Sequence, residues 1–372
     1  MKKRILSAFS LLLALCLLAG CSASSGAAGS AVSGSASSAA EGSLQRYSTV
    51  YYDTFDTVTT VIAYCTSQEE FDTQMEALHA DLVAYNQLYD IYNDYEGVNN
   101  IKTINDNAGI APVKVDARIV AMLQEAVKMY TVTGGQTNIA MGSVLNLWHE
   151  HREAANDSTL HSTLPTDAEL QTAAQHTDIR NLVIDEAAGT VYLTDPDMSL
   201  DVGSCGKGYA CEMAAQAAEA RGLTSALISV GGNLRAIGEK PGGLPWTAGV
   251  EDPKNASSTY SSTDSYISAV TMDGNMALVT SGDYQRYYEV DGVRYCHLID
   301  PDTLYPATYF SSVSVRTADS GLADCLSTGL FCMSLADGQA LVESMDGVEA
   351  LWYEPDGTIV RSSGWESCQM MS

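Results

Sequence analysis

Hydrophobic and polar positions follow two periods along the chain, and their order predicts its elements. The stretch "TVTTVIAYC", Thr57 to Cys65, alternates β-branched residues and predicts a strand. The next stretch, "EEFDTQMEALHADLVAYNQLYDIY", has apolar residues at helical spacing and predicts a long helix. The stretch "DARIVAMLQEAVKMYTVTGG" predicts a second helix, with Asp116 near its start and Gly134-Gly135 after its end. The chain therefore mixes strands and helices from its first folded segment.

The remaining periodic segments contain more strands than helices. "NLVIDEAAGTVYLT" predicts a hairpin around Ala188-Gly189, and a third helix is expected from about Lys207 to Arg221. Later elements are expected as strands at "SALISVGG", "WTAGV", "SYISAVTM", "MALVTSG" and "SSVSVRT", a helix within "GLADCLSTGLFCM", a short helix and the strand "EALWYE". There is no internal repeat and no linker after residue 43. Several strands with helices clustered between them predict one α+β domain over residues 44–372, with a mixed or antiparallel sheet and packed helices.

The first 43 residues have the composition of a targeting segment rather than of a core. Three basic residues precede the apolar run "LLLALCLLAG", which is too short to span a membrane and is typical of a secretory signal over residues 1–20. "LAGC" resembles the lipobox of bacterial lipoproteins, which implies that Cys21 is lipidated; a cleaved signal with a chance cysteine is the alternative. Residues 21–43, rich in Ser, Gly and Ala, predict a flexible tether. We therefore expect a lipid-anchored protein on the extracytoplasmic face of a bacterial cell membrane.

Charge and cysteine usage narrow the class of protein. The chain has 19 basic and 46 acidic residues, and without the three basic residues of the signal its formal charge is −30. Phosphate backbones repel such a protein, so nucleic acid is excluded as a partner. The cysteines beyond the signal show no CxxC pair and no zinc-type spacing, and we expect most to be small buried thiols, with one exported disulfide as the alternative. They are Cys65, Cys205, Cys211, Cys296, Cys325, Cys332 and Cys368.

A glycine-rich segment leads into the third predicted helix. In "LDVGSCGKGYACEMA" an acid, three glycines and a lysine precede the helix, which is the composition of a phosphate-binding turn. It is not a Walker loop, because that pattern needs Gly where the chain has Asp201 and Ser or Thr where it has Gly208. The alternative is a helix entry that binds no ligand. A histidine, His297, follows in "RYCHLIDPD"; it is structural, or it acts as a general base beside a diphosphate.

Three oxygen-bearing residues share one face of an otherwise apolar predicted helix. In "GLADCLSTGLFCM", Asp324, Ser327 and Thr328 are three and four residues apart. Hard oxygen ligands suit Mg²⁺, which keeps waters or substrate phosphates in its coordination sphere. The alternative is that Asp324 caps the first turn of the helix while the two hydroxyls bond back to helix carbonyls.

Seven segments in order resemble the FAD:protein FMN transferases, the ApbE family. They are "YYDTFDTVTTVIAY", "IYNDYEGVNNIKTINDNAG", "GGQTNIAMGSVLNLWHE", "LDVGSCGKGYA", "LISVGGNLRAIGEKPGGLPWTAGVEDP", "TSGDYQRYYEVDGVRYCHLIDPDTLYP" and "LADCLSTGLF", from about Tyr51 to Met345. The resemblance implies a Mg²⁺-dependent enzyme that splits FAD at its diphosphate, releases AMP, and esterifies FMN to a Thr or Ser hydroxyl of an acceptor flavoprotein.

The resemblance also implies roles for individual residues. Asp324 and Thr328 are implied Mg²⁺ ligands, with Ser327 beside them and Ser204 from the glycine-rich turn. His297 is implied to deprotonate the acceptor hydroxyl, and Asp324 acts with it in catalysis. The implied FAD contacts are Phe55, Tyr92, Thr137, Asn138, Ile139, Asp201, Lys207 and Ile299, the last through its backbone.

Departures from the family pattern affect two of these contacts. The family usually has Asp where this chain has Asn138, which removes one negative charge near the cofactor. The spacing after Tyr92 is longer than in many relatives, so Tyr95 is a second candidate for the flavin contact.

The resemblance leaves the fate of FMN open. A pyrophosphatase would release FMN and AMP to water, and a non-catalytic FAD-binding lipoprotein would release neither. The Ser-Gly-Ala-Thr motif of family acceptors is absent from this chain, so we expect transfer to a separate exported electron-transfer protein.

Overall fold

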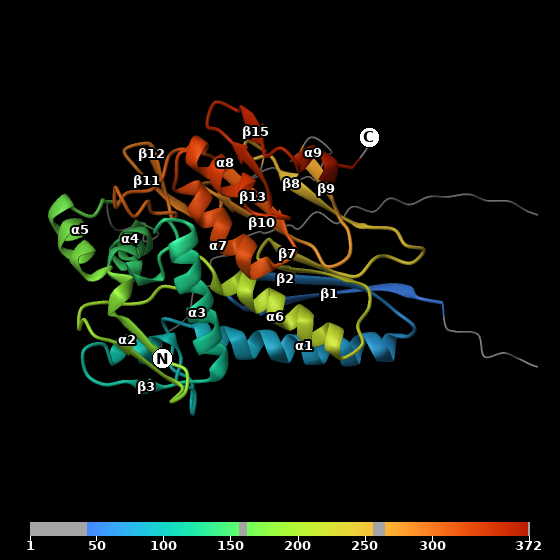
Figure 1. Cartoon of the computed structure of the whole chain (residues 1–372), viewed down its shortest axis with the longest axis horizontal. Helices are drawn as coiled ribbons and strands as arrows, with labels where there is room; N and C mark the ends of the chain where they lie inside the picture. The colour runs from blue at the N-terminus through green and yellow to red at the C-terminus, as the bar shows by residue number, and fades with distance from the viewer. Residues whose placement is uncertain (1–42, 156–161, 256–264, 371–372) are drawn as a thin grey trace, which may run out of the picture.

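An eight-stranded antiparallel sheet forms the centre of the protein (Figure 1). The computed structural model describes residues 43–155, 162–255 and 265–370. In sheet order the strands are β1 (Gln45–Thr54), β2 (Thr57–Cys65), β6 (Ala226–Val230), β7 (Asn233–Ile237), β10 (Ala277–Gly282), β13 (Ser312–Thr317), β14 (Glu349–Tyr353) and β15 (Ile359–Arg361). The predicted α+β domain is confirmed, and its central sheet is antiparallel throughout.

Helices cover one face of this sheet in the order of its strands. The helix α1 (Gln68–Tyr89) packs on β1 and β2, and α6 (Gly206–Ala220) packs on β6 and β7. Next to them, α7 (Ser320–Phe331) lies on β10 and β13, and α8 (Leu335–Glu343) lies on β14. Because α6 and α7 cover adjacent strands, the glycine-rich segment and the helix with the three oxygen-bearing residues lie side by side.

A hairpin of β8 (Trp246–Glu251) and β9 (Tyr266–Met272), with the short helix α9 (Trp365–Cys368), covers the other face. Alternation along β2 supplies both cores: Val61 and Ala63 lie in the cluster under α1, whereas Ile62 and Tyr64 pack against the cluster around Trp246. The sheet is therefore buried on both faces.

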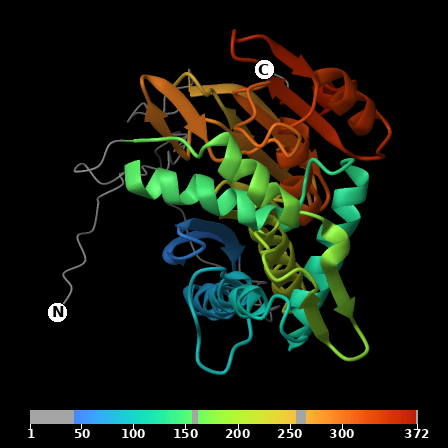
Figure 2. The same ribbon diagram turned by 90° about the vertical axis from the view of Figure 1, so that its left-hand side faces the viewer.

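A lobe beside the sheet holds the remaining elements (Figure 2). In that view the green helices lie between the blue strands β1 and β2 and the orange strands. The lobe contains α2 (Ile101–Asp106), α3 (Ala117–Val132), the 3₁₀ turn η1 (Ile139–Met141), α4 (Gly142–Ala155), α5 (Asp167–Ala173), η2 (Ala174–His176), η3 (Ile179–Asn181), a sheet of β3 (Val113–Lys114), β5 (Thr190–Leu193) and β4 (Leu182–Asp185), and a hairpin of β11 (Tyr287–Val290) and β12 (Val293–Cys296). Trp148 of α4 stacks on Tyr295 of β12 with ring centroids 6.1 Å apart, which fixes the hairpin against α4.

Most predicted elements are confirmed, with small shifts at their ends. The predicted strand at Thr57–Cys65 is β2, and Asp116 caps α3 by accepting a hydrogen bond from the N–H of Arg118. The first long helix ends at Tyr89, earlier than predicted, because Asp90 adopts an extended backbone. All seven cysteines beyond the signal are free and buried, as expected for small thiols.

Three predictions concern the N-terminal segment. The signal (residues 1–20), the lipidation site Cys21 and the tether up to residue 42 lie outside the described residues. Within the described part of the chain, no helix is both long and apolar enough to cross a membrane.

A buried ion pair holds the start of α7. Glu212 of α6 accepts hydrogen bonds from Nε of Arg235 at 2.7 Å and from the backbone N–H of Ser320 at 2.9 Å. Both side chains of the pair are 3% exposed. Burial alone would raise the pKa of Glu212, but hydrogen bonding and charge from Arg235 and the N–H of Ser320 lower it.

We predict that Glu212→Ala lowers the free energy of unfolding by about 3–5 kcal/mol, because Arg235 would remain buried without a partner. Since the folded-state pKa is lowered, the contribution of Glu212 is full above its unfolded pKa of about 4.3 and is lost as pH falls through the folded value. Urea unfolding at pH 7 measures the change. Glu125→Ala, which removes the exposed pair with Lys128, is the control and should cost under about 1 kcal/mol. Equal losses in the two variants would contradict this account.

Candidate active site

The site begins where α6 and α7 touch. Asp324 of α7 is 4% exposed, and its Oδ2 accepts a hydrogen bond from the backbone N–H of Gly208 at 2.8 Å. The N-cap of α7 is Asp319, which accepts from the N–H groups of Gly321 and Leu322. The alternative that Asp324 caps the first turn is therefore wrong, and this buried carboxylate has no capping role.

Hydroxyl groups from a helix and a strand meet beside Asp324. Ser327 Oγ donates to the carbonyl of Asp324 at 3.0 Å, so the expected bond back to a helix carbonyl does form. Oγ of Ser281 lies 2.8 Å from Oγ of Ser327 and 3.5 Å from Oγ1 of Thr328. Ser281 belongs to β10, and the sequence analysis missed it. A carboxylate and three hydroxyls therefore converge on one face of α7.

Close contact between α6 and α7 depends on a glycine. A Cβ on Gly208 would lie 2.3 Å from the carbonyl oxygen of Ser320 and 2.4 Å from Cβ of Asp324. Any larger residue must push the two helices apart and move Asp324.

We predict that Gly208→Ala reduces activity at least about 10-fold, because it displaces Asp324 by a sizeable fraction of an ångström. Gly206→Ala in the same helix is the matched control, since its Cβ would find its nearest neighbours at 3.5 and 3.6 Å, an ordinary contact distance. Initial rates of FAD consumption measure both variants. Equal rates for Gly208→Ala and Gly206→Ala would show that the contact does not position Asp324.

The glycine-rich segment forms a turn that leads into α6. The N–H of Asp201 donates to the carbonyl of Ile139 at 2.9 Å, and Oδ1 of Asp201 accepts from the N–H of Gly203 at 2.8 Å. Ser204 lies in this turn without a side-chain hydrogen-bond partner among the described residues. Cys205, the N-cap of α6, makes no side-chain cap. In the first turn, the N–H of Gly206 donates to Val202 and that of Gly208 to Asp324, which leaves the N–H of Lys207 without a partner among the described residues.

Lys207 of α6 lies between the acidic groups and the histidine. Burial raises the pKa of Asp201 and of Asp324, and the positive charge of Lys207 opposes the rise in both. The same ammonium group contributes to a low pKa of His297. Lys207 Nζ itself donates only to the carbonyl of Gly203 at 3.2 Å, so its charge is not consumed by a direct ion pair.

His297 is held as a neutral ring. Its Nδ1 lies 3.2 Å from the carbonyl oxygen of Arg286, so the neutral ring carries its proton on Nδ1 and leaves the lone pair of Nε2 free. Burial, followed by the positive charges of Arg286, Lys207 and Arg152, lowers the pKa of His297 to about 3. Its ring is therefore neutral across the physiological pH range, with Nε2 unprotonated.

Three further residues of this site were missed by the sequence analysis. Arg152 and His149 come from α4, and Nη2 of Arg152 lies 2.7 Å from Nδ1 of His149. Arg286 precedes β11, and its guanidinium has no hydrogen-bond or ion-pair partner among the described residues. With Lys207, these arginines gather positive charge around His297 in a chain of formal charge −27. A concentration of cations in an acidic protein favours an anionic ligand at this point.

The segment before α4 connects the glycine-rich turn to α7. Thr137 is buried, and its Oγ1 donates to the carbonyl of Cys325 at 2.7 Å. Asn138 caps η1 through the N–H of Ala140, and its Nδ2 donates to the carbonyl of Thr177 at 3.0 Å. The side chains of Thr137 and Asn138 thus bind backbone groups, while the carbonyl of Ile139 binds the N–H of Asp201.

A cavity of about 420 Å³ opens beside Asn138. Gln136 contributes Oε1, a buried atom with no hydrogen-bond partner in the described structure, while its Nε2 donates to Asp302 at 3.0 Å. The wall also includes Pro301 and Asp302, which follow Ile299 in the chain. Ile299 is 7% exposed, and its carbonyl accepts from the thiol of Cys332 at 3.7 Å.

The turn between β1 and β2 lies near the loop after α1. Phe55 and Asp56 have φ of 56° and 49°, a left-handed conformation that is uncommon for such residues. The N–H of Phe55 donates to Oδ1 of Asn86 at 2.7 Å, which holds this strained turn against α1. Non-glycine residues in this region of φ cluster at functional sites.

Geometry separates the two candidate tyrosines. The hydroxyl of Tyr95 donates to Oδ2 of Asp90 at 2.8 Å. Tyr92 is 52% exposed, and its ring lies tilted against that of His149 with ring centroids 5.2 Å apart. Partial burial, then the charge of Asp201, raises the pKa of Tyr92 to about 12, which places its hydroxyl near the glycine-rich turn. Tyr92 is therefore the one that faces the site.

Comparisons with known proteins agree with this geometry. The chain is 34% identical over 278 residues to the FAD:protein FMN transferase of Treponema pallidum (strain Nichols), covering 71% of this chain and 73% of that protein. It is 29% identical over 280 residues to the protein of the same name from Vibrio cholerae, covering 75% and 77%. The crystal structure of the ApbE protein from Thermotoga maritima superposes with a TM-score of 0.76 at 29% identity, covering 88% of this chain and 100% of that one. The ApbE family model matches residues 54–352, and the chain belongs to that family.

Proposed function

We propose that this protein is a Mg²⁺-dependent FAD:protein FMN transferase. It cleaves the diphosphate of FAD, releases AMP and joins FMN to a Thr or Ser hydroxyl of an acceptor flavoprotein. The observation that carries the proposal is a buried carboxylate of α7, bound to α6 and sharing its helix face with two hydroxyls, together with three cations whose charges act on a neutral histidine. Family membership adds independent support.

The oxygen cluster fits a magnesium ion. Mg²⁺ prefers oxygen ligands and completes its coordination with waters and substrate phosphates. Here one carboxylate, whose pKa is raised by burial, lies among neutral hydroxyls, so a cation would relieve an unfavourable buried charge. The residues that would hold it are Ser204, Ser281, Asp324, Ser327 and Thr328. When bound, Mg²⁺ would neutralise charge on the diphosphate oxygens.

Three cationic side chains bind the diphosphate oxygens that the metal does not contact. Lys207 lies in the first turn of α6, and its charge acts on His297 together with the charges of Arg152 from α4 and of Arg286 from the segment before β11. Guanidinium groups match phosphate oxygens in geometry, and a free Arg286 needs no existing ion pair to be broken first. These groups hold the diphosphate in place and stabilise the charge that develops as it splits.

His297 supplies the base for the acceptor. The Nε2 atom takes the proton of the acceptor hydroxyl as its oxygen attacks the flavin-side phosphorus. The bond from that phosphorus to the bridging oxygen breaks, and AMP leaves with the bridging oxygen. The Nδ1–H bond to the carbonyl of Arg286 keeps the ring oriented and stabilises the proton it gains.

The two ends of FAD lie on opposite sides of the diphosphate. Tyr92 and Phe55 form the flavin end, where an exposed aromatic ring can stack on isoalloxazine. The cavity beside Asn138 takes the adenosine end, where the unpartnered Oε1 of Gln136 can accept from an amino group. Asn138 leaves this end less negative than the usual Asp, because its amide is neutral. Its side chain bonds to backbone groups.

Location and partners are part of the proposal. The signal-like N-terminus and Cys21 support a lipid-anchored protein on the extracytoplasmic face of a bacterial cell membrane. Its acceptors are exported electron-transfer flavoproteins with a Ser-Gly-Ala-Thr-type motif. Transfer to them occurs in trans, because this chain lacks the motif.

Metal removal tests the catalytic part of the proposal. We expect the full-length protein with FAD, Mg²⁺ and an acceptor domain that carries a Ser-Gly-Ala-Thr motif to form AMP, and EDTA to lower the rate at least about 100-fold, because the diphosphate charge would remain unneutralised. Chromatography of the nucleotides measures AMP, and excess Mg²⁺ added after EDTA should restore the rate. AMP formation that persists unchanged in EDTA would contradict the metal site.

A further inference from the structure

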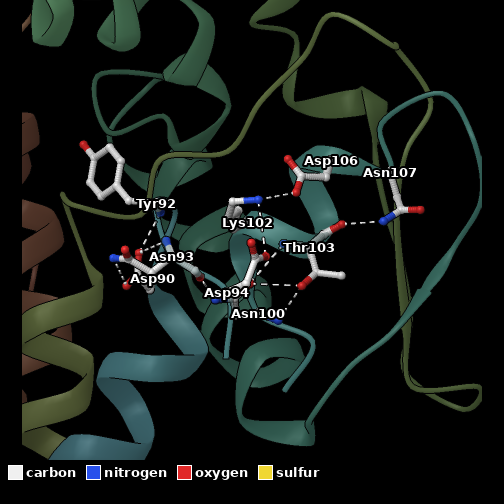
Figure 3. Close-up of polar contacts among 9 residues, drawn as sticks. All are labelled: Asp90, Tyr92, Asn93, Asp94, Asn100, Lys102, Thr103, Asp106 and Asn107. Atoms are coloured by element: carbon white, nitrogen blue, oxygen red, sulfur yellow. Dashed lines mark hydrogen bonds and ion pairs between the residues drawn. The ribbon is translucent and has the colours of Figure 1, made fainter. Parts of the chain in front are cut away.

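One carboxylate organises the loop that follows α1. Asp90 Oδ1 accepts hydrogen bonds from the backbone N–H groups of Tyr92 at 2.6 Å and Asn93 at 3.0 Å. Its Oδ2 accepts from Nδ2 of Asn93 at 2.9 Å and from the hydroxyl of Tyr95 at 2.8 Å. Figure 3 shows the bonds from Tyr92 and Asn93 to Asp90, with the ring of Tyr92 pointing away from them. The two carboxylate oxygens of Asp90 therefore accept four hydrogen bonds from three residues of the loop.

The far end of the loop is fixed independently. Asn100 is fully buried, and its Nδ2 donates to the carbonyl of Asn93 at 2.9 Å. Its Oδ1 accepts from the N–H of Thr103 at 3.0 Å in the capping box of α2. The N–H of Lys102 donates to the carbonyl of Asp90 at 3.0 Å, which ties the two ends together. The loop is anchored at both ends, and only the Asp90 carboxylate bonds the N–H of Tyr92 itself.

The side chain of Tyr92 makes few contacts of its own. Its hydroxyl makes no hydrogen bond among the described residues, its side chain is 52% exposed, and its ring makes a tilted contact with His149. The position of the ring therefore follows from the backbone of the loop, and that backbone is set by Asp90. An exposed aromatic side chain on an unsupported loop would lose entropy on binding a ligand.

We propose that Asp90 is a positioning residue, whose carboxylate preorganises the loop so that the ring of Tyr92 is already placed for the flavin of FAD. This inference rests on the proposed function, since it names FAD as the ligand of the site. It assigns Asp90 to binding rather than to the chemical step, because Asp90 bonds only to its own loop. Replacing it should weaken FAD binding and leave turnover at saturating FAD nearly unchanged.

The test measures FAD binding to the full-length protein by isothermal titration, with KM for FAD and kcat alongside. We expect Asp90→Ala to raise Kd and KM about 10-fold or more, and Asp90→Asn, which keeps one oxygen for the two N–H groups, to recover most of the affinity. Asp94→Ala is the matched control, because Asp94 lies in the same loop and its carboxylate pairs with Lys102 at 3.3 Å. It should bind FAD as the unmodified protein does.

A double variant shows whether Asp90 acts through Tyr92. If it does, adding Asp90→Ala to Tyr92→Ala changes Kd less than about 2-fold, because the ring that Asp90 positions is already gone. Additive effects, or Asp90→Ala binding like the unmodified protein, would overturn the inference while leaving the proposed function intact. An unmodified protein that binds FAD but transfers no FMN overturns the proposed function alone. A protein that binds no FAD overturns both.

Discussion

Asp324→Asn should abolish metal-dependent activity while leaving the fold intact. Asparagine keeps an oxygen for the N–H of Gly208 at the position where Asp324 accepts it at 2.8 Å. It removes the negative charge of the buried carboxylate that shares a face of α7 with the hydroxyls of Ser327 and Thr328. We expect kcat to fall about 10³-fold, because a preorganised charge that stabilises the reaction is lost.

The thermal stability of Asp324→Asn without metal should not fall as its activity does. Burial raises the pKa of Asp324, so the ionised carboxylate is unfavourable in the metal-free protein at neutral pH. The variant should therefore melt no lower than the unmodified protein in EDTA. Mg²⁺ should raise the Tm of the unmodified protein and leave that of Asp324→Asn unchanged. Circular dichroism melts with and without Mg²⁺ measure this, and an equal shift in both proteins would place the metal elsewhere.

His297→Ala is expected to lower kcat about 10²–10⁴-fold, the usual loss when a general base is removed. FAD binding should change little, because Nδ1 of the ring bonds to the carbonyl of Arg286 and Nε2 contacts the acceptor hydroxyl in the proposed reaction. His297→Gln is a control for size. Unchanged transfer in His297→Ala would exclude this residue as the base.

The pH profile of the unmodified protein gives a second measurement of the same group. Because burial and three positive charges lower the pKa of His297 to about 3, the base is deprotonated and active above about pH 4 in the free protein. The profile of kcat/KM should therefore show no acid limb between pH 5 and 8 from this residue. Bound diphosphate partly cancels the charges of Lys207, Arg152 and Arg286, so the acid limb of kcat should lie at higher pH than that of kcat/KM. Coincident limbs near pH 6.5 would contradict this electrostatic account.

The sequence predicted contacts that lie within one element. Asp324, Ser327 and Thr328 lie on one side of α7 because helical spacing alone decides that. The alternation of Thr57–Cys65 predicted the strand β2, and the N-cap residue Asp116 predicted the start of α3. Both predictions use only neighbouring residues. Helical spacing therefore suffices to predict that these three oxygen-bearing side chains share a face.

Residues from other elements could not be placed in this way. Ser281 reaches the hydroxyl cluster only because β10 lies under α7, and the order of strands in the sheet is set by tertiary packing. Arg152 and His149 were missed because α4 was not predicted: it mixes buried Val144 and Trp148 with polar residues, and its preceding turn obscures its start. The glutamate, histidine and arginine side chains of this helix suggest a solvent-exposed segment until the fold shows their neighbours.

One feature of the sequence did point beyond its own element. The glycine-rich turn contains Gly208, and only a glycine allows the approach of α6 to Asp324. The pattern suggested an anion-binding turn, and the structure adds that this glycine also sets the distance between the two helices that build the site.

Covalent labelling of an acceptor tests the central claim most directly. The full-length protein is incubated with FAD, Mg²⁺ and a separate acceptor domain that carries a Ser-Gly-Ala-Thr motif, and the acceptor is examined on a denaturing gel for flavin fluorescence. The acceptor with its final Thr replaced by Ala is the control. We predict a fluorescent acceptor band that requires Mg²⁺, Asp324 and the acceptor Thr, together with one AMP for each flavin attached. AMP and free FMN with no labelled acceptor, in two different acceptor domains, would contradict the transferase and leave a pyrophosphatase.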